Sequence, residues 1–163
     1  MSELSNNLNP LQASGFQFVT DSRRMANFSF FAQSVSHPGI SANAAEVPYS
    51  QISSVPQIAD KLTYDQLTAT ILIDEDMETY KEIVDWMKWN VENNDPGVTD
   101  EKSHFADLTL NIYDSKNNKV LNIIYRDAHP INVGEITMFS NTDAIVLLNV
   151  AVVFRFTSFD IVG

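Results

Sequence analysis

The chain has 163 residues, of which 44% are hydrophobic and 19% charged, which is the size and composition of one globular domain. It contains no cysteine, so disulfide frameworks, thiolate nucleophiles and cysteine-based zinc or iron–sulfur sites are excluded. Ten Lys and Arg against 21 Asp and Glu give a formal net charge of −11, which argues against a protein that coats nucleic acid, because such binding depends on Lys and Arg neutralising phosphates.

Residues 1–15 form a polar leader that lacks the basic and apolar regions of a secretory signal, so we expect synthesis in a cytoplasm. The longest apolar stretch, residues 144–154, is interrupted by Asn149 and is shorter than the roughly 20 residues that a membrane helix needs. No membrane insertion is therefore expected, and we predict a single domain over residues 16–163.

Two short strands are predicted after the leader, joined by a charged turn at residues 21–24, because aromatic and apolar residues recur at every second position. These residues are Phe16, Phe18, Phe28, Phe30 and Ala32.

Residues 36–60 are predicted to be a long loop, because three prolines with Ser, Ala and Asn between them disfavour a helix or a central strand. Several side chains in this loop are too apolar for a solvated linker, so we expect it to dock on another surface. These side chains belong to Val47, Tyr49, Ile52, Val55 and Ile58.

Alternating apolar residues predict a strand over residues 67–73, and the acidic residues 74–76 then cap a helix over residues 75–92. One face of this helix is predicted to pack on the sheet, because its apolar residues recur at steps of three and four. This stripe consists of Met77, Tyr80, Val84, Met87 and Val91, with Ile83 beside it.

The rest of the chain is predicted to be β-structure. A hairpin joins residues 108–112 to residues 120–125, and another strand covers residues 131–138. The last strand is predicted over residues 144–156, with both faces covered because both are largely apolar.

No catalytic or metal-binding motif is found in the sequence, and no cofactor is expected. The three histidines, His37, His104 and His129, are far apart and are expected in loops or turns, whereas a metal site needs a cluster. Trp86 and Trp89 could stack on sugars, although at helical spacing they more often contact the core or another subunit.

The acidic residues are concentrated between residues 74 and 107, where eleven Asp and Glu face three Lys. Two interpretations remain open, namely the solvated face of a helix or a surface whose negative charge has a function.

Two segments resemble the tail tube proteins of contractile-tailed, T-even-type bacteriophages. The first is the strand–helix segment that begins at residues 62–71 and continues through residues 83–86. The second, an anchor segment, is the Pro-x-Asn-Val-Gly-Glu pattern formed by Pro130, Asn132, Val133, Gly134 and Glu135, which is followed by a turn and a closing strand. The resemblance covers residues 16–160.

The resemblance implies a mainly β (α+β) fold, an antiparallel β-sandwich or partly open barrel with one flanking α-helix. It also implies a homo-hexameric ring in which strands of neighbouring subunits join, and rings that stack into a hollow tube through which DNA passes without specific binding. The implied partners are the tail sheath protein and the baseplate and terminator proteins, and the implied location is the virion tail, assembled in the host cytoplasm. No catalysis is implied.

In such a tube, the apolar part of the 36–60 loop is our candidate for the contact between stacked rings. This candidate surface consists of Val47, Pro48, Tyr49, Ile52, Val55, Pro56 and Ile58.

Two alternatives remain open at this stage. A baseplate-proximal tube initiator or a tail terminator ring would keep the fold and change its position in the tail. A carbohydrate-binding β-sandwich that uses Trp86, Trp89 and tyrosines fits the composition but not the anchor segment.

Overall fold

A computed structural model describes residues 10–21, 23, 25–49, 51–94, 104–141 and 145–163. The first nine residues of the predicted leader, residues 22 and 24 of the predicted turn and residues 95–103 after the helix therefore lie outside the described residues. No helix among the described residues is both long and apolar enough to span a membrane.

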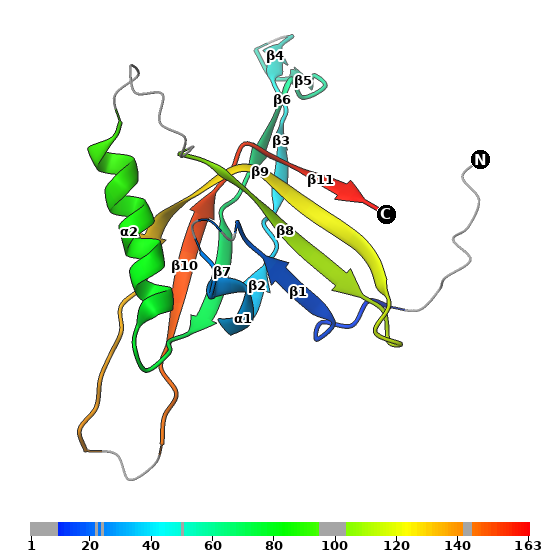
Figure 1. Cartoon of the computed structure of the whole chain (residues 1–163). Helices are drawn as coiled ribbons and strands as arrows, with labels where there is room; N and C mark the ends of the chain where they lie inside the picture. The colour runs from blue at the N-terminus through cyan, green and yellow to red at the C-terminus, as the bar shows by residue number, and fades with distance from the viewer. Residues whose placement is uncertain (1–9, 22, 24, 50, 95–103, 142–144) are drawn as a thin grey trace.

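The body of the protein is an antiparallel β-structure in which seven strands form two layers around one core (Figure 1). Six strands are hydrogen-bonded in the order β1-β8-β9-β10-β7-β2, and β11 pairs with β9. The strands are β1 (Phe16–Val19), β2 (Ala32–Ser36), β7 (Leu67–Leu72), β8 (Ala106–Tyr113), β9 (Lys119–Val133), β10 (Asn149–Arg155) and β11 (Ser158–Val162).

Strand β9 belongs to both layers. Its first half pairs with β8 on one side and β11 on the other, whereas its last residues pair with β10. The strand changes direction at Asp127, whose φ of 52° lies in the left-handed region that extended strands avoid. The bend lets one continuous strand connect the two layers.

The core lies between the layers and is strongly aromatic. Phe18 of β1, Phe28 and Phe154 of β10 are almost completely buried, and their ring centroids lie 5.7 to 6.4 Å apart in tilted and edge-to-face arrangements. Such arrangements are favourable for aromatic pairs. The mainly β, antiparallel fold with a flanking helix, predicted above, is confirmed.

The predicted strand over residues 28–32 is wrong. Residues Phe28–Phe31 form the short helix α1, and β2 begins only at Ala32. A strand with a period of two would bury Phe28, and one turn of helix buries it as well.

The main helix, α2 (Glu78–Glu92), lies on the flank of the body (Figure 1). It begins three residues later than predicted, after Met77, whose φ of 54° is left-handed. The Asp74 carboxylate accepts hydrogen bonds from the backbone N–H groups of Glu78 and Thr79, at 3.1 and 3.2 Å. It therefore satisfies two of the unpaired donors at the start of the helix.

Alanine at Asp74 should lower the free energy of unfolding by roughly 0.5–1 kcal/mol, because a helix cap is lost at a position that solvent partly screens. Burial alone would raise the pKa of Asp74, but the hydrogen bonds from Thr79 and Glu78 outweigh it and lower the pKa below its ordinary 3.8. A carboxylate whose pKa is lowered by folding stabilises the folded state at pH values above its pKa in the unfolded chain. This stabilisation is lost as the pH falls through its pKa in the folded protein. Urea denaturation should therefore show the cost of Asp74→Ala at neutral pH and a smaller cost below about pH 3.5.

Asp85→Ala, on the exposed side of α2, is the matched control and should be neutral or slightly stabilising, because Ala is the better helix former. An equal loss in both variants would show that Asp74 does not act as a cap.

The predicted contact face of α2 is only partly right: Ile83, predicted beside the stripe, is fully buried, and Tyr80 and Met87 of the stripe are half-buried and pack against the core. The buried residues of α2 are Thr79, Ile83 and Trp86, one position away from the predicted stripe, and Val91 of that stripe is 78% exposed. The stripe was assigned by counting apolar residues, which gives no weight to the large side chain of Trp86. Burying Trp86 rotates the helix so that the stripe lies beside the contact face.

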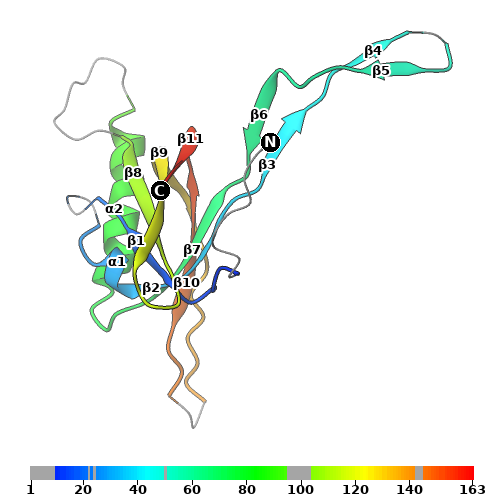
Figure 2. The same ribbon diagram turned by 90° about the vertical axis from the view of Figure 1, so that its right-hand side faces the viewer.

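The predicted loop over residues 36–60 forms most of a two-stranded arm that projects from the body (Figure 2). In this arm, β3 (Ile40–Asn43) pairs with β6 (Lys61–Tyr64), and β4 (Glu46–Pro48) pairs with β5 (Ser54–Pro56). Pro48 and Pro56 are compatible with these strands because each stands last in its strand, where a missing N–H is tolerated in a ribbon with two edges.

The predicted 13-residue closing strand is divided. Its pairing begins only at Asn149 in β10, and after Arg155 the chain turns into β11. Residues 145–147 are exposed, and β10 alternates buried residues with largely exposed ones, so the expectation that both faces are covered is wrong. The longest strand is β9, with 15 residues.

Candidate assembly surfaces

The apolar residues predicted to contact another ring lie at the outer end of the arm. We call residues 47–49 and 51–58 the arm tip. Tyr49 is 81% exposed and Ile58 is 96% exposed, while Val47 and Val55, which face each other across β4 and β5, are about half exposed. The structure thus brings the predicted residues together on one projection (Figure 2).

The base of the arm is fixed to the body by an aromatic cluster. His37 Nδ1 lies 2.8 Å from the hydroxyl of the fully buried Tyr125, and the His37 ring stands edge-on to Phe159 with centroids 4.9 Å apart. From the other side of the arm, the Tyr64 ring contacts Phe159 and Phe156. Burial lowers the pKa of His37, which favours the neutral imidazole. The arm therefore leaves the body in a defined direction.

The anchor segment Pro130, Asn132, Val133, Gly134 and Glu135 lies at the end of β9 and the start of the following connection. Its strand residues pair with β10, and the Gly134 N–H donates to the Ala151 carbonyl at 2.8 Å. A Cβ at Gly134 would lie 3.3 Å from that carbonyl oxygen, closer than nine in ten Cβ contacts, which favours glycine at this position. The segment is thus a structural junction between β9 and β10.

An apolar groove of about 480 Å³ separates α2 from the end of β9. Its α2 side consists largely of the stripe that is predicted above to pack on the sheet. The lining residues are Tyr80, Val84, Met87, Lys88, Val91, Glu92, Asn132 and Val133.

A second apolar projection was missed by the sequence analysis. We call residues 134–141 and 145–148 the β9–β10 loop, which extends from the opposite end of the body to the arm (Figures 1 and 2). Its exposed side chains are Met138 (69%), Phe139 (62%), Ile145 (98%), Val146 (58%) and Leu147 (71%). The sequence signal for this projection is the run of consecutive apolar residues after position 143. A half-buried strand needs an apolar residue only at every second position, and a solvated turn needs none.

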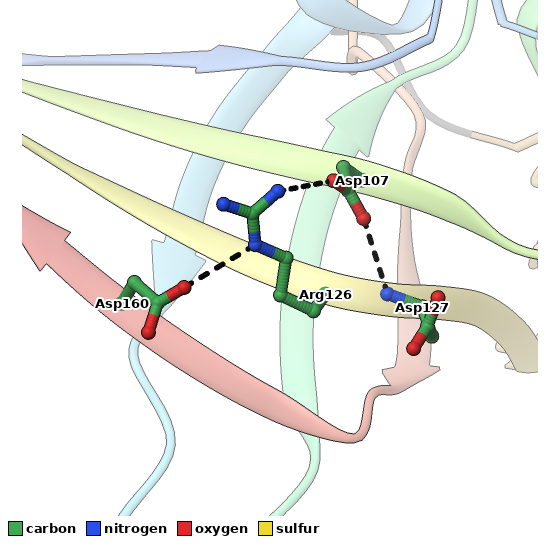
Figure 3. Close-up of polar contacts among 4 residues, drawn as sticks. All are labelled: Asp107, Arg126, Asp127 and Asp160. Atoms are coloured by element: carbon green, nitrogen blue, oxygen red, sulfur yellow. Dashed lines mark hydrogen bonds and ion pairs between the residues drawn. The ribbon is translucent and has the colours of Figure 1, made fainter.

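The outer face of the β8–β9–β11 layer carries a charge cluster (Figure 3). The Arg126 guanidinium donates through Nη1 to Asp107 at 2.7 Å and through Nε to Asp160 at 3.2 Å, and Asp107 also accepts from the Asp127 backbone N–H. Hydrogen bonds to the two carboxylates raise the pKa of Arg126. The positive charge of Arg126 is therefore neutralised by two carboxylates.

Trp86, one of the residues weighed above for sugar binding, is part of the core. Trp86 is 2% exposed and donates through Nε1 to the His104 carbonyl at 3.2 Å, so it cannot stack on a ligand. His129 lies within β9 rather than in a loop, and the His104 ring contacts Trp89 in a tilted arrangement with centroids 4.9 Å apart. Across the described part of the chain, no three His, Asp or Glu lie close enough together to hold a metal ion.

The same fold occurs in chains of contractile injection assemblies. A chain of the anti-feeding prophage (AFP) baseplate is 11% identical, with a TM-score of 0.67, and the alignment covers 95% of this chain and 97% of that one. A chain of the sheath–tube complex of the extracellular contractile injection system PVC is 11% identical, with a TM-score of 0.65 and coverages of 94% and 92%. Hcp1 from Flavobacterium johnsoniae is 8% identical, with a TM-score of 0.51 and coverages of 90% and 94%.

The fold therefore defines an antiparallel β-structure of the kind built into contractile systems. The profile of the phage tail tube protein family matches residues 3–162, and the chain belongs to this family. No protein of curated function matches the sequence.

Proposed function

We propose that the chain is a structural, non-enzymatic subunit of a phage contractile tail. Six copies form a ring by joining the edge strands of neighbouring subunits, and the rings stack into a tube that lies inside a sheath. The tube is assembled in the host cytoplasm, becomes part of the virion and conducts the DNA genome into the host.

The observation that carries this proposal is the set of open sheet edges. Within the described residues, β1, β2 and β11 each pair with only one neighbouring strand. Open edges are prone to uncontrolled pairing, and a closed ring of subunits removes them. Head-to-tail contacts of this kind produce a ring when the rotation between subunits closes.

The charge of the chain supports DNA passage. A channel that held phosphates through many Lys or Arg contacts would retain the genome, because binding free energy increases with each phosphate that is neutralised. The net charge of −11 opposes such contacts, and the carboxylates of Asp107 and Asp160 neutralise the exposed Arg126.

The acidic α2 is the proposed contact for the sheath. It lies on the flank of the body, and Glu78, Glu82, Asp85 and Glu92 outnumber its two lysines. An acidic helix surface attracts a basic partner over about a Debye length, roughly 8 Å at physiological salt.

Negative-stain microscopy of the purified protein tests the proposal. Stacked rings or tubes are expected for the main tube subunit. Rings that never stack would instead identify a tube initiator or terminator ring, and monomers at millimolar concentration would contradict ring formation itself.

A further inference from the structure

Two exposed apolar projections lie at opposite ends of the protein. The arm tip ends one projection, and the β9–β10 loop forms the other (Figure 2). The loop is held at its base by two backbone hydrogen bonds, from Gly134 to the Ala151 carbonyl at 2.8 Å and from Ile73 to the Leu148 carbonyl at 2.9 Å. Both projections therefore have a defined origin on the body.

Both projections expose large apolar side chains to solvent. Ile145 and Leu147 of the β9–β10 loop are 98% and 71% exposed, and Tyr49 and Ile58 of the arm tip are 81% and 96% exposed. Contiguous apolar surface of this kind marks a site of protein–protein contact.

The charge distribution indicates the partner. Residues 47–58 contain no Asp, Glu, Lys, Arg or His, and residues 134–148 contain only Glu135 and Asp143, although the chain as a whole carries −11. Two copies of an acidic chain repel each other wherever their charged surfaces meet. Their uncharged surfaces can meet without that cost, whereas a basic partner would favour the acidic surfaces.

We infer that the arm tip of one copy packs on the β9–β10 loop of a second copy in the next ring. This inference rests on the proposed stacking of rings and adds the receiving surface. Two complementary patches at opposite ends of one molecule form a head-to-tail contact that does not close, and such a contact generates a filament.

Engineered cysteines test the pairing, because the natural chain has none. The double variant Tyr49→Cys, Leu147→Cys is assembled and treated with a short bifunctional maleimide. We expect a ladder of covalent multimers on a denaturing gel, and only dimers when the two single variants are mixed. The matched control, Tyr49→Cys with Asp85→Cys on the exposed side of α2, should give no ladder.

A second measurement uses Ile145→Ser with Leu147→Ser. We expect rings to remain and tube yield to fall about tenfold or more, because burying a leucine side chain changes an association constant by at least that factor. Tubes of normal yield without cross-links would overturn the inference and leave the proposed tube function standing. Absence of both rings and cross-links would overturn the inference and the proposed function together.

Discussion

Replacing Phe154 by alanine is expected to lower the free energy of unfolding by about 3–5 kcal/mol. Phe154 is fully buried and contacts the rings of Phe18 and Phe28, so the substitution opens a cavity where β1, α1 and β10 meet. The loss combines the transfer free energy of the ring with the contacts that the cavity removes. Urea denaturation measures it, at a protein concentration where sedimentation shows monomers, because assembly would add apparent stability.

The matched control is Phe139→Ala, which removes the same ring from a position that is 62% exposed. It should change the stability of the monomer by less than about 0.5 kcal/mol, as surface substitutions usually do. Equal effects of the two substitutions would contradict the placement of the core.

Two aspartates on the arm tip, Tyr49→Asp and Val55→Asp, are expected to abolish tubes while rings and fold persist. In the proposed contact these side chains are buried against another copy, and an uncompensated buried charge costs several kcal/mol. The arm is a separate ribbon whose tip does not contribute to the core, so the body should remain folded. Microscopy counts tubes and rings, and circular dichroism follows the fold.

Lys81→Asp serves as the control for charge, since it changes the net charge by the same −2 on the exposed side of α2. It should leave tubes intact in the absence of sheath. If the arm-tip variant formed tubes of normal length, the arm tip could not be the contact between rings.

The fold class and the family were both predictable, because they depend on local patterns. Strand β7 alternates buried and half-buried residues along its length, and the β8–β9 hairpin shows the same period of two. The anchor segment that supported the family prediction is a junction at which a close backbone contact favours glycine. Such constraints act within a few residues and therefore leave a readable pattern.

The errors arise where the surroundings, rather than local pattern, decide the structure. The Phe28 side chain can be buried from a strand or from one turn of helix, and in the folded protein it is buried from the helix α1. Ile145 and Leu147 look like strand residues, but the monomer offers them no cover. The stripe on α2 is likewise predicted to pack on the sheet, whereas only Tyr80 and Met87 pack against the core, and Val84 and Val91 line a groove. A chain that buries surface against other copies carries apolar residues that remain exposed when the chain is considered alone.

The bend at Asp127 has a mechanical consequence. Because one covalent backbone runs through both layers, a pull on either layer is transmitted to the other through β9 without depending on the packing between them. The chain crosses between the layers a second time at the short turn from β10 to β11, so the layers can slide past each other only by deforming both connections.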